Sequence, residues 1–413
     1  MGRAPSDAEA AVRLLTPEAV RERAGQVMAA AERDELRHFA LDAGRLDVAA
    51  DYVIETMRET YPDLDIPQHS RWRHFAAGGA DRWARLAATL ADDGDERARI
   101  RFDLAVTSVL VDAGAGDRWR YREPETGQVF ARSEGLAVAS FRAFEAGLFS
   151  TDPDRPLRAD AGALKALSDD RLAAAFQAGD DNPLVGIGGR AALLRRLGRA
   201  CESAPDLFGA ARPRIGGLFD YFKARSSANQ TVPARSILLA LLRGLGSIWP
   251  GGNRLAGIDL GDTWRHPAAR AEDASDGLVP FHKLSQWLAY SLIEPLQEAG
   301  IAVTELDALT GLAEYRNGGL FVDTGVLRPK HPGVIGRAHR PDSETVVEWR
   351  ALTVSLLDRL ADRVRDKLGR DRDALPLARI LEGGTWLAGR RIAAELRPGG
   401  PPPITLDSDG AVF

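Results

Sequence analysis

Apolar residues recur three and four positions apart in several stretches of this chain of 413 residues, which is the spacing of an amphipathic α-helix. In residues 283–299 the residues that share one face are Leu284, Trp287, Leu288, Leu292 and Leu296. Thr16 followed by Pro17 has the form of a helix N-cap with proline in the first turn. Helices are predicted for residues 16–58, 81–110, 136–147, 236–245, 283–299, 305–316 and 343–368.

Strand signals are weak by comparison. Runs of β-branched residues are scarce, and residues 121–130, with Pro124 and Gly127, predict one short hairpin. A mostly α fold with at most a minor β-hairpin is therefore expected. Residues 151–160 are rich in proline and aspartate and are read as a connection, which gives an N-terminal helical subdomain at 1–155 and a second subdomain at 156–397. Residues 398–413 are expected to form an extended tail.

Composition and charge remove several classes of protein. No apolar run approaches the roughly 18 residues that span a bilayer, and residues 1–9 lack an apolar signal segment, so a cytoplasmic protein with no membrane partner is expected. The single cysteine, Cys201, excludes a disulfide framework and a thiolate metal cluster. The net charge of −5 and the absence of a basic stripe argue against a nucleic-acid duplex as partner, so nucleic-acid chemistry would concern a free nucleotide.

A glycine-rich segment, Leu184-Val-Gly-Ile-Gly-Gly-Arg190, precedes a predicted helix. Such a turn is typical of helix-hairpin-helix elements, because glycine permits positive φ and the following helix offers backbone N–H groups to an anion. An ordinary turn between helices would have the same composition, and both readings stay open.

Two polar motifs lie farther along the chain. Only five of the 54 basic residues are lysines, so Lys283 in Phe281-His-Lys-Leu-Ser-Gln286 is a candidate functional residue. A solvent-exposed polar face of a helix would have the same composition. In Leu312-Ala-Glu-Tyr-Arg316, the Asn-Gly-Gly that follows predicts a helix end, which places Glu314 in the last turn. The helix dipole disfavours a carboxylate there, so Glu314 is either a functional residue or a surface partner of Arg316.

Other segments carry weaker signals, and each can be structural or functional. They are Ser70-Arg-Trp-Arg-His-Phe75, Asp112-Ala-Gly-Ala-Gly116, Arg132-Ser-Glu-Gly135, Gly261-Asp-Thr-Trp-Arg-His-Pro267 and Asp323. The first interleaves aromatic rings with cations, as the wall of a site for a planar anion would. The seven histidines lack H-x-x-x-H and H-E-x-x-H spacing, and neither a G-x-S-x-G elbow nor a strand-linked dinucleotide motif is present. Neither a metal nor an organic cofactor is therefore expected.

Taken together, these motifs resemble the fourth protein of the URC uracil-catabolism pathway of yeasts and bacteria. The resemblance rests on residues 70–75, 112–116, 132–136, 182–186, 281–286 and 312–319, and it covers nearly the whole chain. It implies a pathway in which uracil becomes a nucleotide, its ring is opened and urea is released, with a ribosylurea species as the intermediate.

The C-terminal half is also similar to queuosine-salvage nucleotide N-glycosidases, which resemble helix-hairpin-helix DNA glycosylases in fold. Phe281, Lys283 and Gln286 match that family's first motif. Residues 313–316 match its second motif, with Glu314 in place of the family's aspartate, and residues 348–350 match an E-x-R pattern. This similarity implies a helix-hairpin-helix glycosylase-like architecture for residues 156–397.

The two resemblances imply a metal-independent N-ribosyl hydrolase that releases urea from a ribosylurea phosphate, with other enzymes of the uracil pathway as partners. Glu314 and Lys283 are the implied catalytic residues. The implied substrate-binding residues are Trp72, Arg73, His74, Asp112, Ser133, Glu134, Asp220, Asp262, His266, Phe281, His282, Gln286, Tyr315, Arg316 and Asp323. Two alternatives stay open: a non-catalytic protein that binds and channels the intermediate, and a hydrolase of an acyclic C–N bond in the opened ring.

Overall fold

The computed structural model describes residues 6–91, 93–249 and 252–407. They form two compact units, each assembled from separate stretches of the chain. Unit 1 holds the described residues of 1–69, 251–286 and 305–407, and unit 2 holds those of 70–250 and 287–304. Helices dominate both units and the strands form only two-stranded pairs, so the expected mostly α fold is confirmed. The subdomain limits expected near residues 155 and 397 stay a prediction.

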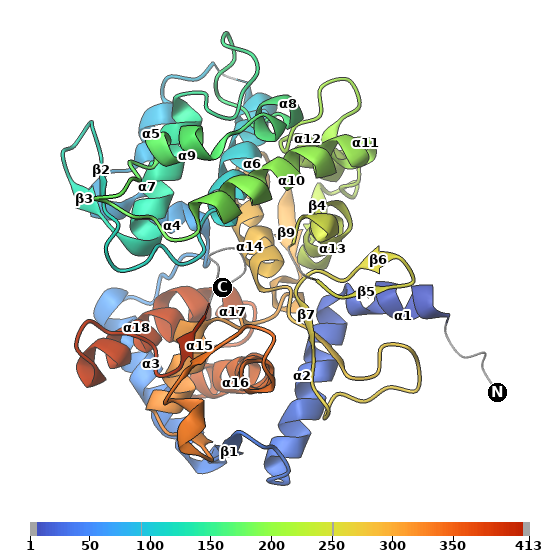
Figure 1. Ribbon diagram of the computed structural model, residues 1–413, viewed down its shortest axis with the longest axis vertical. Coiled ribbons are helices and arrows are strands. Elements are labelled where there is room, and N and C mark those ends of the chain that lie inside the picture. The colour runs from blue at the N-terminus through green and yellow to red at the C-terminus, as the bar shows by residue number, and fades with distance from the viewer. Residues whose placement is uncertain (1–5, 92, 250–251, 408–413) are drawn as a thin grey trace. The chain divides into compact units, whose positions relative to one another are not determined.

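Unit 1 is built around one long helix. Its helices are α1 (Asp7–Leu14), α2 (Pro17–Glu32), α3 (Leu46–Thr60), α15 (Tyr315–Asp323), α16 (Glu344–Leu368), α17 (Leu377–Ile380) and α18 (Trp386–Leu396). Its strands are β1 (Phe39–Leu41), β5 (Arg254–Leu255), β6 (Ile258–Asp259), β7 (Thr263–Arg265), β8 (Leu278–Pro280), β10 (Leu327–Pro329), β11 (Ala338–His339) and β12 (Thr405–Leu406). The helices α2, α3 and α15 pack against α16 (Figure 1).

The sequence explains where α16 begins and ends. The Ser343 hydroxyl accepts a hydrogen bond from the Val346 backbone N–H, and Gly369 stops the helix with a φ of 61°. Between these caps, Val346, Val347, Ala351, Leu352, Leu356, Leu357, Leu360, Ala361 and Val364 are all buried. This helix is the core of unit 1 because its apolar positions recur at helical spacing.

Unit 2 surrounds a helix that is buried on nearly all sides. Its helices are α4 (Arg71–Phe75), α5 (Arg82–Ala87), α6 (Gly94–Leu110), α7 (Arg132–Glu145), α8 (Ala161–Lys165), α9 (Asp169–Ala175), α10 (Ile187–Ser203), α11 (Pro205–Phe208), α12 (Gly217–Lys223) and α13 (Ala234–Leu245). Its strands are β2 (Tyr121–Arg122), β3 (Val129–Phe130), β4 (Thr231–Pro233) and β9 (Ala302–Thr304). The last eleven residues of α6, from 100 to 110, are all buried, and α4, α7, α10 and α12 pack against this helix.

The helix α14 (Lys283–Glu298) belongs to both units, with its first four residues in unit 1 and the rest in unit 2. A short antiparallel pair, β7 with β8, precedes it and places Thr263 opposite Pro280. The pairing brings Asp262 next to Phe281, at the start of α14. None of the described helices combines the length and the apolar character that crossing a bilayer requires.

Several predicted elements are confirmed. Thr16 caps α2, residues 121–130 form the β2–β3 hairpin with Tyr121 opposite Phe130, and α13, α14 and α16 lie where the apolar spacing placed them. The helix expected at 305–316 is wrong. Glu305 has a φ of 54°, only a short 3-10 turn (Leu306–Ala308) follows, and the chain is irregular up to residue 314.

The glycine-rich turn does open a helix, because Gly186 adopts a φ of 72° immediately before α10. The side chain of Arg190 turns back into the loop before it and donates to the carbonyls of Val111, Ala113 and Val185. This arginine connects residues 111–114 to the turn, so both glycine-rich segments take part in one structural contact. The helix-hairpin-helix architecture itself stays a proposal.

Candidate functional site

The first feature of the site is the way Asp262 fixes the start of α14. Its carbonyl accepts hydrogen bonds from the backbone N–H of Phe281 (2.9 Å) and His282 (3.3 Å). Its carboxylate accepts one from the backbone N–H of Lys283 at 3.0 Å. His282 is held at a φ of 51°, a conformation that a residue with a side chain adopts at a cost. The sequence motif at 281–286 is therefore a tightly constrained helix entry.

Arg350 connects this entry to the segment that carries Glu314. Its two terminal nitrogens donate to the Asp262 carboxylate at 2.8 and 2.7 Å, and its Nε donates to the carbonyl of Ala313 at 3.2 Å. Burial alone raises the pKa of Asp262, but the charge and hydrogen bonds of Arg350 outweigh it and hold that pKa well below its usual range. The guanidinium also lies 4.0 Å from the ring centre of Phe281.

Glu314 begins a helix instead of ending one. It is the N-cap of α15, and its two carboxylate oxygens accept hydrogen bonds from the backbone N–H groups of Arg316 (2.7 Å) and Asn317 (2.5 Å). The expected placement in a last turn is wrong, because Asn317-Gly-Gly319 lies inside α15. A carboxylate is favoured at this end of a helix.

The glycines at 318 and 319 serve close packing and not a helix stop. A Cβ added to Gly318 would lie 2.7 Å from the Trp349 ring and 2.8 Å from the Thr353 hydroxyl, and one added to Gly319 would lie 3.0 Å from Pro403. These approaches join α15 to α16 and to the C-terminal segment. They explain why a sequence typical of a helix end occurs in the first turn of a helix.

The electrostatics of Glu314 are unusual for a carboxylate. Burial raises its pKa, and this effect exceeds the opposing effects of the two backbone hydrogen bonds and of the positive charges of Lys283 and Arg316. The group is 8% exposed. A buried carboxylate whose pKa is raised, beside a lysine charge, has the properties of a general acid or base.

Two neighbouring polar side chains on the same helix entry have hydrogen-bonding capacity left for a ligand. The Gln286 oxygen accepts from the Thr310 N–H at 3.3 Å, and among the described residues its Nε2 has no partner. The His282 Nε2 donates to the Leu14 carbonyl at 2.9 Å, which leaves Nδ1 as an acceptor with no partner in the described chain. Burial lowers the pKa of His282, which favours the neutral form of the ring. We call Glu314, Lys283, His282 and Gln286 the Glu314 cluster.

The other predicted residues of unit 1 have structural partners. Arg316 donates to the Gly400 carbonyl at 2.8 Å, and its guanidinium lies 5.0 Å from the ring centre of Tyr315. His266 Nε2 lies 3.4 Å from Glu348. Asp323 pairs with Arg397 at the far end of α15, nine residues or roughly 13 Å along the helix from Glu314.

The predicted residues near the N-terminus gather in unit 2, around an arginine that the prediction did not include. Buried Arg71 pairs with Asp112 at 2.8 Å, donates to the Ser108 hydroxyl at 2.7 Å and lies 3.4 Å from the Ser133 carbonyl. Burial lowers the pKa of Arg71, and the charges of Asp112 and Glu134 oppose that shift. We call Arg71, Ser108, Asp112, Ser133 and Glu134 the Arg71 cluster.

The aromatic and cationic residues beside Arg71 also have partners within unit 2. The Trp72 indole N–H donates to the Ser291 carbonyl at 2.9 Å, Arg73 pairs with Glu294, and the His74 ring lies 6.0 Å from that of Trp287. Asp220, by contrast, forms a surface ion pair with Arg99 and lies outside both clusters. Arg71 lies in the motif at residues 70–75 that was singled out, so its position beside Trp72 was the signal that could have found it.

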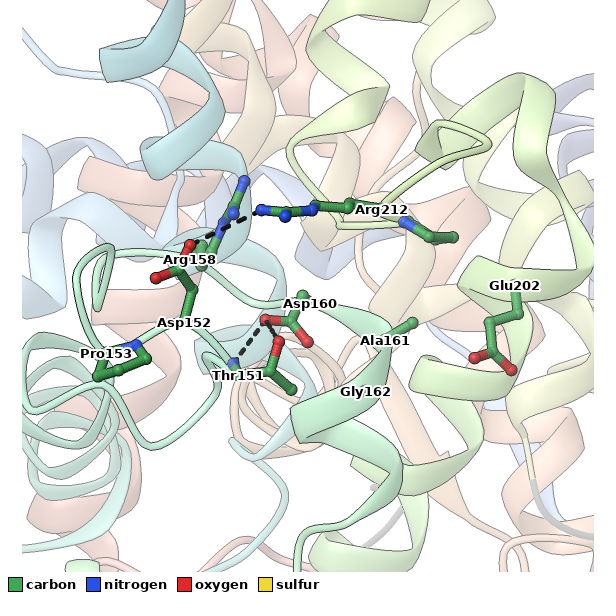
Figure 2. A pocket seen from close by; sticks show the side chains of 10 residues that line it. Thr151, Asp152, Pro153, Arg158, Asp160, Ala161, Gly162, Glu202 and Arg212 are labelled. Atoms are coloured by element: carbon green, nitrogen blue, oxygen red, sulfur yellow. Dashed lines mark hydrogen bonds and ion pairs between the residues drawn. The ribbon is translucent and has the colours of Figure 1, made fainter.

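A cavity of about 510 Å³ lies elsewhere in unit 2, among residues of the proline- and aspartate-rich connection. It is lined by Thr151, Asp152, Pro153, Arg158, Asp160, Ala161, Gly162, Glu202, Arg212 and Pro213. Figure 2 shows Thr151 hydrogen-bonded to Asp160 and Arg212 reaching toward Asp152, 3.8 Å away. None of the predicted site residues lines this cavity.

Comparison with known proteins gives the family. Residues 13–413 match the family described as "Protein of unknown function (DUF1688)". The chain belongs to this family. It is 38% identical to Protein urg3 of Schizosaccharomyces pombe over 98% of this chain and 99% of that protein. It is also 38% identical to Uracil catabolism protein 4 of Lachancea kluyveri, over 95% of this chain and 97% of the relative. These two matches confirm the first resemblance, and the similarity to queuosine-salvage enzymes stays a prediction.

Proposed function

We propose that this family member acts in uracil catabolism as an N-ribosyl hydrolase that releases urea from a ring-opened uracil nucleotide, a ribosylurea phosphate. The observation that carries the proposal is the buried carboxylate of Glu314, held by two backbone N–H groups beside the charge of Lys283. The name of the relative from Lachancea kluyveri supports the pathway. A helix-hairpin-helix glycosylase-like architecture is part of the proposal, and the left-handed turn at Gly186 before α10 supports it.

The chemistry needs an anion beside the anomeric carbon, because cleavage of the N-glycosidic bond passes through an oxocarbenium-like transition state. The Glu314 carboxylate stabilises that positive charge and accepts a proton from the attacking water. The water oxygen forms the new bond to the anomeric carbon, and the bond to the urea nitrogen breaks. The proton that Glu314 accepts passes to that nitrogen, directly or through solvent, so that neutral urea leaves and Glu314 is ionised again. This reaction requires no metal.

The remaining members of the Glu314 cluster bind the leaving group. The open donor of Gln286 suits the urea carbonyl, and the neutral His282 Nδ1 suits a urea N–H. Lys283 contacts the ribose or its phosphate and lowers the energy of the ionised Glu314. Asp262 and Arg350 position these groups, because they join the start of α14 to the residue before Glu314.

The test is product analysis after incubation of synthetic ribosylurea 5-phosphate with the purified, chelator-treated chain. Urea and ribose 5-phosphate in equal amounts are expected. Release of a three-carbon acid from the corresponding acyl-bearing compound, without free ribose 5-phosphate, would identify a hydrolase of the acyclic C–N bond instead. Saturable binding with no product would identify a binding and channelling protein. Either result would overturn the N-ribosyl hydrolase.

A further inference from the structure

A second group of potential ligands lies in unit 1, at residues far apart in the sequence. A ring nitrogen of His38 and carboxylate oxygens of Glu344 and Glu348 all lie within 4.8 Å of one another. Glu344 and Glu348 are four residues apart on α16, so they share one face of that helix. His38 directly precedes β1, whose partner is β10. None of the three residues belongs to the Glu314 cluster.

One ring nitrogen of His38 is buried and open to a ligand. The residue is 7% exposed, and among the described residues its Nε2 has no hydrogen-bond partner. The nearest Glu344 oxygen is 3.6 Å away, which is too far for a good hydrogen bond. The other ring nitrogen, Nδ1, lies 3.0 Å from His331 Nε2. If Nδ1 donates to His331, the lone pair of Nε2 faces carboxylates, which is unfavourable unless a cation lies between them.

Backbone hydrogen bonds fix the orientation of the Glu348 carboxylate. It is fully buried, and one oxygen accepts hydrogen bonds from the backbone N–H groups of His38 (3.0 Å) and Phe39 (2.8 Å). Within the described part of the chain its other oxygen has His266 Nε2 as an ion-pair partner, at 3.4 Å. A carboxylate in the protein interior is costly without a strong positive partner, and a divalent ion supplies one.

We propose that His38, Glu344 and Glu348 bind one divalent first-row transition-metal ion. Imidazole nitrogen with two carboxylates suits Zn²⁺ or Mn²⁺, whereas Ca²⁺ prefers oxygen ligands alone. Ligand atoms on one tetrahedral Zn²⁺ are about 3.4 Å apart, so small side-chain rotations close the site. The contact from His38 to His331 supplies the outer hydrogen bond that metal-bound histidines make. Glu344 is one-third exposed and gives the ion a way in.

The ion would join the chain before β1 to the first two turns of α16. Its role is to hold these segments together, and the proposed reaction at Glu314 does not use it. Loss of the ion should therefore lower the melting temperature, whereas the chemistry at Glu314 depends on other residues. The two proposals can fail separately for this reason.

The experiment is calorimetric titration of the chelator-treated full chain with Zn²⁺, Mn²⁺ and Ca²⁺ in separate runs. One Zn²⁺ or Mn²⁺ per chain should bind and raise the melting temperature, and Ca²⁺ should not bind. Glu344→Gln should weaken Zn²⁺ binding by about tenfold or more. The matched control is Asp358→Asn, which removes a carboxylate of similar exposure (33% against 34%) from the same helix, and it should bind Zn²⁺ like the unmodified chain.

A second variant, His38→Gln, removes the nitrogen ligand and keeps a polar side chain of similar length. It should weaken Zn²⁺ binding at least as much as Glu344→Gln, and Co²⁺ added to the unmodified chain should show visible absorption that both variants lose. No saturable binding to the unmodified chain, or equal binding by the unmodified chain and both variants, overturns the proposal.

Discussion

The two units each bury a charged cluster, but around groups of opposite sign. In the Glu314 cluster burial raises the pKa of a carboxyl group, which moves it toward neutral pH. In the Arg71 cluster burial lowers the pKa of a guanidinium, which nevertheless stays protonated because a guanidinium group does not lose its proton in proteins. The same desolvation therefore makes one group ready for proton transfer and leaves the other a fixed charge.

Glu314 and Arg71 also differ in the kind of partner that holds them. Glu314 is held by backbone N–H groups, which orient it without neutralising it, whereas Arg71 has a carboxylate partner in Asp112. A charge with a direct counter-ion is compensated and mainly contributes to stability. A carboxylate oriented by backbone dipoles, with positive charges nearby, keeps its capacity to interact with a reacting molecule. On this reasoning we propose a functional role for Glu314 and a structural one for Arg71.

The largest expected effect is on catalysis at Glu314. Glu314→Gln should lower the rate of urea release by about 10²- to 10⁴-fold, the range typical of removing a general acid or base. The fold should survive, because the glutamine oxygen still accepts one backbone hydrogen bond and the lost one costs about 1 kcal/mol. Circular dichroism and the melting temperature check the fold, and Asp323→Asn at the other end of α15 is the control that should keep its turnover. Loss of turnover in Asp323→Asn, with turnover retained in Glu314→Gln, would instead assign the catalytic role to Asp323.

The next effect is on stability at Arg71. Arg71→Met leaves Asp112 buried without its counter-ion, so the free energy of unfolding should fall by about 3–5 kcal/mol. Guanidinium chloride denaturation followed by fluorescence measures it. Replacing both partners, as Arg71→Met with Asp112→Leu, should recover part of the loss. A loss below 1 kcal/mol in the single variant would show that Asp112 is compensated by other groups.

The contributions of two carboxylates of unit 1 to stability should depend on pH in opposite ways. The pKa of Glu314 is raised above 4.5, so its contribution to stability is present below about pH 4.5 and is lost as the pH rises through the raised pKa. The pKa of Asp262 is lowered below 3.8, so its contribution is present above about pH 3.8 and is lost only in stronger acid.

Denaturation at pH values from about 4 to about 8 tests these signs. With rising pH, Glu314→Gln should become more stable relative to the unmodified chain, because the variant has no buried charge to form. The deficit of Asp262→Asn should stay constant above about pH 5. A constant difference for Glu314→Gln across this range would contradict the raised pKa.

The smallest effect concerns Asp220, which lies outside both clusters. Its ion pair with Arg99 is at the surface, with the Asp220 side chain 48% exposed, so Asp220→Asn should change the free energy of unfolding by less than about 1 kcal/mol. Urea release should be unchanged. A loss of turnover in this variant would show that a surface carboxylate takes part in the reaction and would weaken the contrast between the clusters.

Local sequence signals predicted several of the longer helices and the hairpin. The Thr16 cap, the apolar spacing of residues 343–368 and the hairpin at 121–130 are each decided by neighbours within a few positions. The local signals were misleading at residues 305–316, because Asn317-Gly-Gly319 has the composition of a helix end. The structure uses those glycines to let Trp349 and Pro403 approach the backbone, a requirement that arises from residues about 30 and 85 positions away.

The sequence by itself determined the mostly α fold and the helix entry at 281–286, and it singled out Glu314 as a candidate, because composition, apolar spacing and short motifs are local properties. Only the tertiary structure decided that Glu314 caps a helix, that Arg350 connects it to Asp262, and that His38 lies against Glu344 and Glu348. The physical reason is that burial and partners fix the energy of a charge. Both depend on which distant segments pack together.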